Sequence, residues 1–409
     1  MYIVPRFKPN FSFKKIAKVL IKSFSNTLNP YENQKNRQLL EGKFAEYLGV
    51  KNAICVPSAR MGLFLILKNL GLSRSSEVIL PAFTYWAVPE IVKFLKYNPI
   101  FVDINSQSWD LDVSSIEARV TSKTKAIIPT HLYGLPCNMD EVVRIAKKYN
   151  LVIIGDCVQA YGSEYKGQKS AILGDAAYFS FGVTKNVFLL GGGLVVTDKN
   201  DLAAKIRNEV NEYDFLNKSQ IFKRVFESLI MKTVTHPFIF PYGLFPIICL
   251  FNLGDLDIID KVYDAKKKLD NKLPKEYYRL VPYYLQIEAG FEELKKIDLL
   301  NNKRIQHASY FIDNLKGVKG LTLPHFPQEN IKNIFTSFPL QTENRSFLKN
   351  KLLKKGIDVS YGYMKAHDVN CPNAVRLEKN ILHLPVYPGL DKKEVKYICD
   401  SIKKILNNA

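Results

Sequence analysis

Residues 124–159, TKAIIPTHLYGLPCNMDEVVRIAKKYNLVIIGDCVQ, hold two short apolar runs on either side of a helix-like segment. In that segment, residues 139–150, the apolar side chains of Met139, Val142 and Ile145 recur at helical spacing and share one face. A strand, a crossover helix and a second strand form a βαβ unit with parallel strands. This stretch therefore predicts an α/β fold.

The same alternation of apolar runs and longer helix-like segments extends in both directions from this unit. Seven runs share a short, β-branched, almost continuously apolar character: 52–58, 77–83, 99–105, 125–131, 151–157, 176–181 and 193–197. Such runs are typical of strands that helices cover on both faces of a sheet. We predict a large domain over residues 31–210 with a mostly parallel sheet.

The chain outside this domain divides into three regions. Residues 1–30 form a basic amphipathic segment, residues 211–285 a divergent apolar insertion or linker, and residues 286–409 a smaller C-terminal α+β domain. The small domain is expected to hold two strands and a closing amphipathic helix, at 316–324, 334–341 and 391–409.

The composition bounds the class of protein. The chain has 409 residues, of which 47% are hydrophobic and 24% charged, and this excludes a disordered, collagen-like or coiled-coil protein. The net charge of +19 leaves nucleic acid, an anionic membrane surface and phosphorylated small molecules open as partners. The alternative is that the charge only reflects a source whose proteins are generally rich in lysine. The sequence has no RNA-binding or zinc-finger pattern, so nucleic acid is not expected.

The cysteines and the N-terminus indicate the compartment. The six cysteines are scattered without a CxxC pair, which argues against zinc and fits a reducing compartment. No metal site is predicted. The first residues, MYIVPRFKPNF, lack the basic and apolar regions of a secretory signal. We expect a cytoplasmic protein.

Candidate site residues follow from the predicted sheet. In open α/β sheets, ligands bind beyond the carboxyl ends of the strands, so polar residues directly after each apolar run are the candidates. These are Ser58, Thr84, Tyr85, His131, Tyr133, Asp156, Gln159, Ser180 and Lys185.

Two of these residues together indicate a particular chemistry. Asp156 ends an apolar run, and a carboxylate buried there requires a partner, although it could also cap a helix or hold a loop. Lys185 has apolar neighbours on both sides, and a desolvated amine has a lowered pKa and becomes a nucleophile; the alternative is a solvated lysine. A reactive lysine and a carboxylate at neighbouring strand ends suit pyridoxal phosphate (PLP), whose ring nitrogen pairs with an acid.

A series of motifs in fixed order resembles the DegT/StrS family of PLP-dependent sugar aminotransferases. The resemblance is dense from about residue 52 to 207, thins through the middle, and returns at residues 286–298 and in the motif HLPVYPGLDKKEV. The motifs of the dense part are VPSARMGL, ILPAFTYWA, FVDIN, KAIIPTHLYGLPCNMD, VIIGDCVQAYGSEYKG, GDAAYFSFGVTKN and GGGLVVTDKNDLA. The resemblance implies a fold type I aminotransferase, with a large mostly parallel-sheet domain and a smaller C-terminal domain, that works as a homodimer.

The resemblance also implies roles for residues around the cofactor ring. Lys185 matches the family's Schiff-base lysine, and Asp156 matches the partner of the pyridine nitrogen. Gln159 matches the position beside the phenolic oxygen of PLP. Tyr85 matches the aromatic residue that stacks on the ring, and its neighbour Trp86 is the rival. The alternative for both rings is ordinary core or rim packing.

The cofactor phosphate has its own matching positions. Ser58, Ala59 and Arg60 match the turn at a helix start where backbone N–H groups and the helix dipole favour an anion. Ser180 matches a hydroxyl contact to the same phosphate. Arg60 stands where the family commonly has a small hydroxyl residue; its side chain could contact the phosphate or point into solvent.

The implied activity is transfer of an amino group, usually from glutamate, to a keto-sugar, with Lys185 carrying the proton between carbon atoms. The sugar would be nucleotide-linked and serve surface polysaccharide or glycolipid synthesis. One alternative is a membrane-peripheral aminotransferase, at the inner face of the membrane, acting on a lipid-linked or unusual sugar. The other is a non-catalytic PLP-fold binding protein. Dehydratases related to the family carry histidine at the position of Lys185, so lysine favours amino transfer.

The sequence departs from the family pattern at three places. Gly182 replaces a histidine that commonly follows the serine, and Leu190 begins the glycine run where the family has glycine. The Asn-x-Arg segment that reaches the partner subunit's site in the family is not readable around residues 281–284. These changes leave the cofactor residues intact and affect the substrate side.

Residues 233–254 contain no Asp, Glu, Lys or Arg and are long enough to cross a bilayer. Three prolines, Pro237, Pro241 and Pro246, argue against one continuous helix. The segment is expected either in a dimer interface or as a membrane-dipping loop. Residues 11–24 alternate apolar and lysine residues, so this helix either lies on an anionic membrane surface or packs on the core with its lysines in water.

The substrate pocket has weaker candidates. Five aromatic or imidazole side chains could line it, although packing explains each equally well: His131, Tyr133, Tyr361, Tyr363 and His367.

Overall fold

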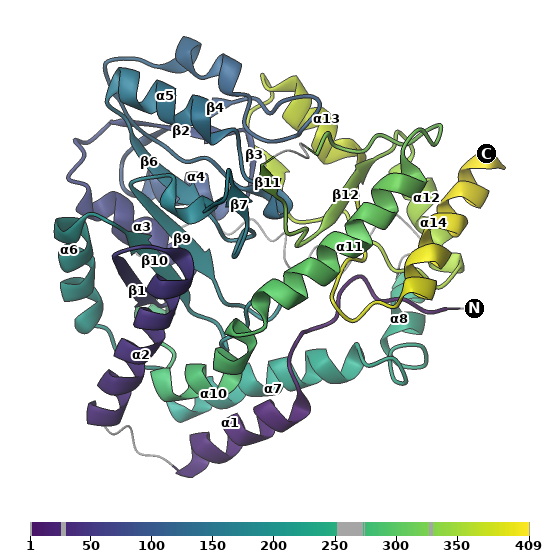
Figure 1. Ribbon diagram of the computed structural model, residues 1–409, viewed down its shortest axis with the longest axis horizontal. Coiled ribbons are helices and arrows are strands. Elements are labelled where there is room, and N and C mark those ends of the chain that lie inside the picture. The colour runs from purple at the N-terminus through teal and green to yellow at the C-terminus, as the bar shows by residue number, and fades with distance from the viewer. Residues whose placement is uncertain (1, 26–29, 252–272, 274, 327–329, 409) are drawn as a thin grey trace.

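The computed structural model describes residues 2–25, 30–251, 273, 275–326 and 330–408, which form a large lobe and a smaller one (Figure 1). The large lobe is built on one seven-stranded sheet. Its strands run in the order β1 (Asn52–Val56), β10 (Gly193–Thr197), β9 (Ala176–Ser180), β6 (Val152–Asp156), β5 (Thr124–Ile127), β2 (Glu77–Pro81) and β4 (Asn98–Val102). Each of the seven predicted apolar runs supplies one strand.

The sheet is mostly parallel, as predicted. Strands β9, β6, β5, β2 and β4 pair in parallel, whereas β10 runs antiparallel between β1 and β9. In the parallel part, the carboxyl ends of the strands lie along one edge. The fold class is therefore confirmed.

Helices cover both faces of the sheet because both sets of alternating side chains are apolar. On β2, Val78 and Leu80 face one core while Ile79 faces the other. The first core is closed by α2 (Pro30–Leu48), α3 (Ala59–Asn69), α4 (Ala87–Phe94) and α6 (Asn200–Asn211), and the second by α5 (Met139–Tyr149). The helix expected from residues 139–150 is this α5.

The small lobe has a separate core around a two-stranded antiparallel sheet, β12 (Phe338–Gln341) with β14 (Ile381–Leu384). Its helices are α11 (Ile297–Leu315), α12 (Arg345–Lys354), α13 (Pro372–Asn380) and α14 (Lys392–Asn407). The closing helix and the strand in 334–341 are confirmed. The strand expected at 316–324 is reduced to a single bridge of Thr322 with Gln341.

Short elements join the two lobes and their loops. Strand β3 (Phe83–Thr84) of the large lobe pairs with β13 (Lys365–Ala366) of the small one. The remaining short elements are β7 (Glu164–Tyr165), β8 (Gln168–Lys169), β11 (Ile331–Lys332), η1 (Val113–Ser115), η2 (Glu117–Arg119), η3 (Leu132–Gly134), η4 (Ser170–Ile172) and η5 (Lys275–Tyr278).

The predicted domain boundary at residue 286 falls inside helix α10 (Tyr283–Leu294). Tyr283 of α10 belongs to the core of the large lobe, and so does Ile297 at the start of α11, whereas Phe311 further along α11 belongs to the small lobe. Helix α11 crosses from one lobe to the other in Figure 1. The boundaries remain a proposal, with α11 as the element that both lobes share.

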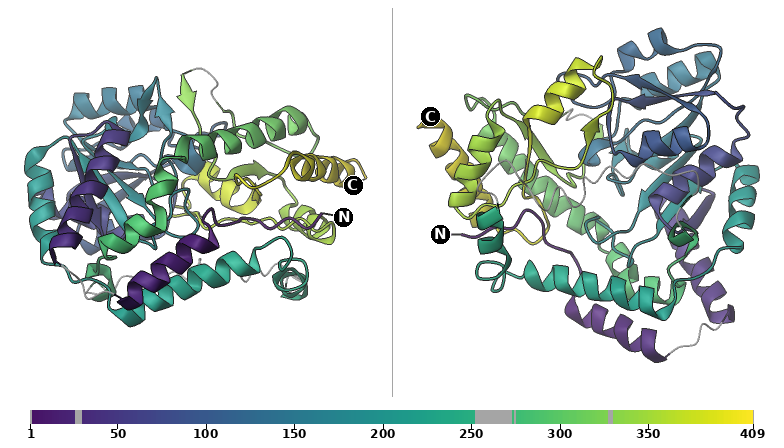
Figure 2. Two further views of the ribbon diagram at one scale, coloured as in Figure 1. Left: turned by 60° about the horizontal axis from the view of Figure 1, so that its bottom comes forward. Right: turned by 180° about the vertical axis from the view of Figure 1, so that it is seen from behind.

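The N-terminal and middle regions pack together. Helix α1 (Phe13–Ser25) confirms the predicted amphipathic helix and lies beside α7 (Lys218–Val234), which is followed by α8 (Leu244–Phe251) (Figures 1 and 2). In the described part of the uncharged span, Pro237 and Pro241 lie between α7 and α8, so the span is not one helix, as expected. Among the described residues, no helix is long and apolar enough to cross a membrane.

Candidate active site

A cavity of about 460 Å³ opens at the carboxyl edge of the sheet. All eight predicted cofactor residues line it: Ser58, Ala59, Arg60, Tyr85, Asp156, Gln159, Ser180 and Lys185. They come from distant parts of the chain and meet because β1, β6 and β9 end at neighbouring points of the sheet. The small lobe contributes the opposite wall, including Tyr363 and Met364.

Asp156 is the last residue of β6 and is only 5% exposed. Its Oδ1 atom accepts a hydrogen bond of 3.1 Å from the N–H of Val158. Burial raises the pKa of this carboxyl, while the Val158 N–H, the Tyr178 hydroxyl and the Lys185 ammonium act in the opposite direction. The carboxylate therefore lacks full compensation, and a cationic hydrogen-bond donor in the cavity would supply it.

Lys185 follows β9 and reaches into the cavity from the side opposite to its apolar neighbours. Those neighbours, Phe179, Phe181 and residues 187–190, are buried in the cores and do not enclose the amine. The lysine itself is partly buried, and its Nζ donates a hydrogen bond of 3.1 Å to the hydroxyl oxygen of Tyr363. These flanking side chains therefore do not form the surroundings of the amine, and the nucleophilic role of Lys185 stays a prediction.

His131 lies beside Asp156 at the end of β5. Its backbone N–H donates to the carbonyl oxygen of Asp156, and its Nδ1 accepts from the N–H of Cys137 at 3.1 Å. Burial lowers the pKa of His131 to about 4, so the ring is neutral at pH 7. The ring adds no positive charge next to Asp156, and its buried Nε2 has no hydrogen-bond partner among the described residues.

The turn that the sequence predicted to bind an anion lies at the start of α3. Ser58 caps the helix by accepting from the N–H of Met61 at 3.2 Å, and Gly62 donates the first backbone bond to Ser58. The N–H groups of Ala59 and Arg60 precede that bond and lie at the positive end of the helix dipole. This arrangement suits a phosphate group.

Strand β10 passes so close to this turn that only glycine fits. A Cβ atom on Gly193 would lie 2.6 Å from the carbonyl carbon of Ser58 and 2.7 Å from the nitrogen of Ala59. Gly192 has a positive φ of 86°, and Gly191 one of 98°. Gly193 therefore sets the position of the turn through close backbone contact, while Gly191 and Gly192 supply positive φ angles in the chain leading to it.

Gln159 and Tyr133 fix each other next to Asp156. The Oε1 atom of Gln159 accepts a hydrogen bond of 3.0 Å from the backbone N–H of Tyr133. Tyr133 has a positive φ of 58°, which is unusual for an aromatic residue and is found here at the cavity wall. Its ring packs edge-on against His383, 5.0 Å between centroids. The amide of Gln159 is thus held in one orientation.

The structure separates Tyr85 from its rival Trp86. Tyr85 lines the cavity, and its ring meets that of Tyr363 edge-on at 5.8 Å. Trp86 is 5% exposed and packs in the core of the large lobe. Packing therefore accounts for Trp86, and Tyr85 is the ring placed to stack on a cofactor.

Arg60 lines the cavity, and its side chain does not point into solvent but contacts a tyrosine. Its Nη1 donates to the hydroxyl oxygen of Tyr277 at 2.8 Å, and its guanidinium carbon lies 4.7 Å from the centre of the same ring. The guanidinium is thus held by a tyrosine from the middle region. What Arg60 offers to a phosphate in this arrangement is its backbone N–H group.

Several cavity residues were not singled out in the sequence. Arg6 and Phe7 come from the N-terminal segment, which is anchored by an ion pair of 2.7 Å between Arg6 and Asp358. His383 and Gly362 come from the small lobe. They do not follow an apolar run of the large sheet, so the search for polar residues at strand ends did not find them.

Only part of the predicted substrate pocket is present. His131, Tyr133 and Tyr363 line the cavity, whereas Tyr361 and His367 do not. The Tyr361 ring lies under the Arg345 guanidinium, 4.3 Å from the ring centre to the guanidinium carbon, and His367 contacts the carbonyl oxygen of Thr84. Packing accounts for these two residues.

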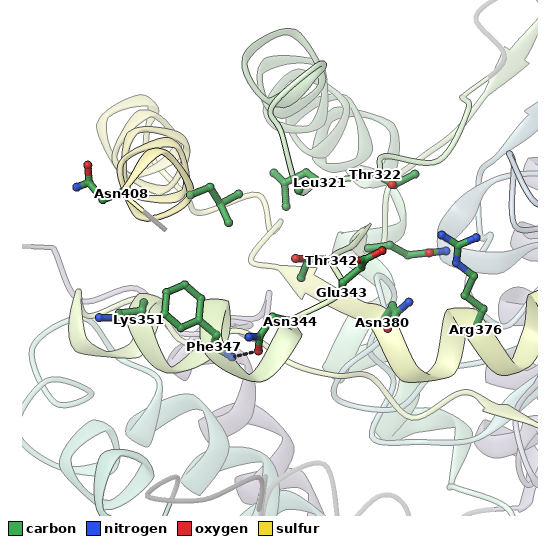
Figure 3. Close-up of a pocket in the computed structure, with 13 residues that line it drawn as sticks. Leu321, Thr322, Thr342, Glu343, Asn344, Phe347, Lys351, Arg376, Asn380 and Asn408 are labelled. Atoms are coloured by element: carbon green, nitrogen blue, oxygen red, sulfur yellow. Dashed lines mark hydrogen bonds between the residues drawn. The ribbon is translucent and has the colours of Figure 1, made fainter.

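A second, more open pocket of about 690 Å³ lies in the small lobe (Figure 3). It is lined by polar residues near the end of β12 and the start of α12, among them Thr342, Glu343 and Asn344. None of the predicted site residues lines it. We therefore assign the chemistry to the cavity at the sheet edge.

The family follows from comparison with known proteins. The model of the DegT/DnrJ/EryC1/StrS aminotransferase family matches residues 15–227 and 284–403. The chain belongs to this family. It is 28% identical over 379 residues to GDP-perosamine synthase of Escherichia coli O157:H7, covering 91% of this chain and 90% of the relative. It is 29% identical to UDP-N-acetyl-3-dehydro-alpha-D-glucosamine 3-aminotransferase of Acidithiobacillus ferrooxidans, covering 90% and 88%.

A solved structure supports the fold. A Streptococcus pneumoniae protein in its PLP form matches with a TM-score of 0.72 and 21% identity, over 100% of this chain and 99% of that one. The predictions of a fold type I aminotransferase and of PLP as its cofactor are confirmed.

The residues of the cavity fit PLP. The uncompensated carboxylate of Asp156 suits a protonated pyridine nitrogen, and the turn at Ser58 suits the phosphate. The close approach of Gly193 holds that turn in place. Lys185 is the amine that faces the same cavity and would bind the cofactor covalently.

Proposed function

We propose that this enzyme transfers an amino group from glutamate to a keto-sugar carried by a nucleotide, for the synthesis of surface polysaccharide or glycolipid. The support comes from relatives that cover about nine-tenths of the chain and act on nucleotide-linked sugars by name, one GDP-linked and one UDP-linked. A spore coat polysaccharide biosynthesis protein of Bacillus subtilis, 24% identical over 91% of this chain, points to the same kind of product. A homodimer in the cytoplasm remains part of this proposal.

The observation that carries the proposal is the pairing of Lys185 and Asp156 in one cavity. PLP, when bound, accepts electrons from the carbon–hydrogen bond that is broken. Asp156 keeps the ring nitrogen protonated because its buried carboxylate is stabilised by that proton. This arrangement also speaks against the alternative of a non-catalytic binding protein, since binding alone requires no amine at that position.

Lys185 carries the proton in this proposal. With PLP bound, its Nζ would be the group that takes the proton from the α-carbon of the donor and gives one back to the cofactor. Tyr363 accepts a hydrogen bond from the amine and so holds it in the cavity. Ser58, Ala59 and Ser180 hold the phosphate, and Tyr85 covers the ring.

The test uses purified enzyme, PLP, glutamate and a panel of GDP- and UDP-linked keto-sugars. Wild type should form 2-oxoglutarate and an amino-sugar, and borohydride should fix the cofactor to Lys185, as located by mass spectrometry. Lys185→Ala should lose both, whereas Lys205→Ala, a lysine exposed on α6, should keep both. Turnover by Lys185→Ala at the wild-type rate would contradict the assignment. If the cofactor binds but no keto-sugar is turned over, the protein would still be an aminotransferase, and the proposed substrate would be rejected.

A further inference from the structure

Helices α1, α7 and α8 carry apolar side chains on two faces. The inner face folds the protein: Ile16 and Val19 of α1 pack with Ile221 and Val225 of α7 in one buried cluster. That accounts for the packing predicted for the N-terminal helix. A second set of large apolar side chains on the same helices points outward and takes no part in this core.

The outward set is continuous along one side of the molecule. On α7, Phe222, Phe226 and Ile230 are exposed at a spacing of four residues, and the first two rings stack at 6.0 Å between centroids. Phe24 of α1 is 70% exposed and meets Phe222 edge-on at 6.4 Å. The two helices therefore present one joined apolar strip.

The strip continues into the turn after α7 and into α8. Phe238 and Tyr242 in the turn are 80% and 86% exposed, and Ile247 and Leu250 on α8 are also exposed. The ring of His236 connects Phe238 with α1, since it lies 6.3 Å from the ring of Phe13. The left view of Figure 2 shows the three helices along the lower edge of the molecule.

Lysines border this apolar surface. Lys14 and Lys18 on α1 and Lys223 on α7 are exposed beside it, and α1 contains no acidic residue. Lys15 and Lys22 pair with Glu293 and Glu288 of α10 on the inner side. The outer side therefore combines large apolar groups with positive charge, interrupted among exposed residues of α7 by Glu227.

Part of this surface lies outside the residues that the family model matches. The family model leaves residues 228–283 unmatched, a stretch that includes the end of α7, the turn and α8. The cavity residues described above lie in or near the matched part. The turn and α8 are thus separate in sequence from the matched residues that line the cavity.

We propose that the outer surface of α1, α7 and α8 docks the enzyme on an anionic lipid bilayer. Exposed aromatic and aliphatic side chains enter the boundary between head groups and acyl chains, while the flanking lysines meet anionic head groups. A second copy of the chain fits less well, because a two-fold interface would place this positive surface against itself. This inference concerns location and stands apart from the proposed substrate.

The test is flotation of the full-length, PLP-loaded enzyme with vesicles of phosphatidylcholine alone or with about one-third phosphatidylglycerol. Wild type should float with the anionic vesicles at low salt and detach as salt rises. Phe24→Ser/Phe238→Ser/Leu250→Ser should weaken binding by about tenfold or more. The matched control is Leu299→Ser/Tyr310→Ser/Val369→Ser, which alters exposed apolar residues elsewhere and should bind as wild type does.

Charge is tested separately. Lys14→Gln/Lys18→Gln should lower the affinity for anionic vesicles by about thirtyfold, since each of the two lysines contributes about 1 kcal/mol and about 1.4 kcal/mol corresponds to tenfold. Lys392→Gln/Lys393→Gln, at the exposed start of α14, is the control.

Three results would overturn the proposal. The first is that the wild-type enzyme binds neutral and anionic vesicles equally. The second is that Phe24→Ser/Phe238→Ser/Leu250→Ser binds anionic vesicles as strongly as wild type does. The third is that this variant is a monomer in light scattering while wild type is a dimer. The last result would assign the surface to a second copy. Amino-transfer activity measured without vesicles tests the proposed function separately, because it does not depend on any of these three results.

Discussion

Gly193→Ala tests whether close backbone contact positions the phosphate turn. Gly193 lies on β10, and its added methyl group would meet three backbone atoms, those of Ser58, Ala59 and Phe179, at 2.6 to 2.7 Å. Backbone atoms of a paired strand and a helix start have no alternative rotamer. Either β10 or the start of α3 must therefore move.

The displacement should lower both the stability of the protein and its affinity for PLP. Overpacking of this kind costs about 1–3 kcal/mol of the free energy of unfolding. Displacement of the Ala59 N–H removes a hydrogen bond to a charged phosphate, worth about 1.5–3 kcal/mol. The Kd for PLP should thus rise by about ten- to one-hundredfold.

The assay combines denaturant unfolding of the apo protein with titration of PLP followed by absorbance. Gly42→Ala is the matched control, because a Cβ on Gly42 in α2 meets no atom within 4 Å. That change should leave PLP affinity unaltered and slightly raise stability, since alanine is the better helix former. An unchanged Kd for PLP in Gly193→Ala, with wild-type stability, would refute the argument that this contact positions the turn.

Three further predictions concern single side chains. Asp156→Asn keeps an oxygen for the Val158 N–H but removes the negative charge, so kcat should fall by about a hundredfold or more while the fold stays intact. A near-normal kcat would show that another group pairs with the ring nitrogen. Tyr363→Phe should lower kcat by about tenfold through loss of the contact with Lys185, whereas Tyr361→Phe, outside the cavity, should not, and equal rates in both variants would remove Tyr363 from the mechanism. Burial raises the pKa of Glu293 from 4.5 to about 7. The folded state therefore keeps this proton to higher pH than the unfolded chain does. As a result, wild type loses about 3 kcal/mol of stability as the pH rises from 4.5 to about 7. The advantage of Glu293→Gln over wild type in denaturant unfolding should therefore grow from pH 4 to pH 8, and a constant difference would contradict the raised pKa.

The sequence could predict that the candidate cofactor residues meet in one cavity, because their positions depend on where strands end. Each of Ser58, Asp156 and Ser180 stands at or just after the end of an apolar run, and parallel strands end at one edge of the sheet. Apolar runs define strands locally, so residues far apart in sequence could be assigned to one place. The glycines at 191–193 were visible in the sequence, but their close contact with the helix start was not.

Contacts made between lobes were not predictable. Tyr363 reaches Lys185 from the small lobe, and Tyr277 takes the guanidinium of Arg60. Neither pair shares a local pattern, since each depends on how separately folded elements dock. The direction of the lysine side chain was not predictable either, because apolar neighbours in sequence do not indicate which side of the chain they bury.

The sequence by itself determined the fold class, the family, the cofactor and the residues at the strand ends, since strand formation and motif order are local properties of the chain. Only the tertiary structure decided which apolar residues are inside. In α1, Ile16 and Val19 are buried while Ile21 and Phe24 face outward, although all four are equally apolar in the sequence. Burial depends on the neighbours that a face meets, and α7 and α10 cover only one side of this helix.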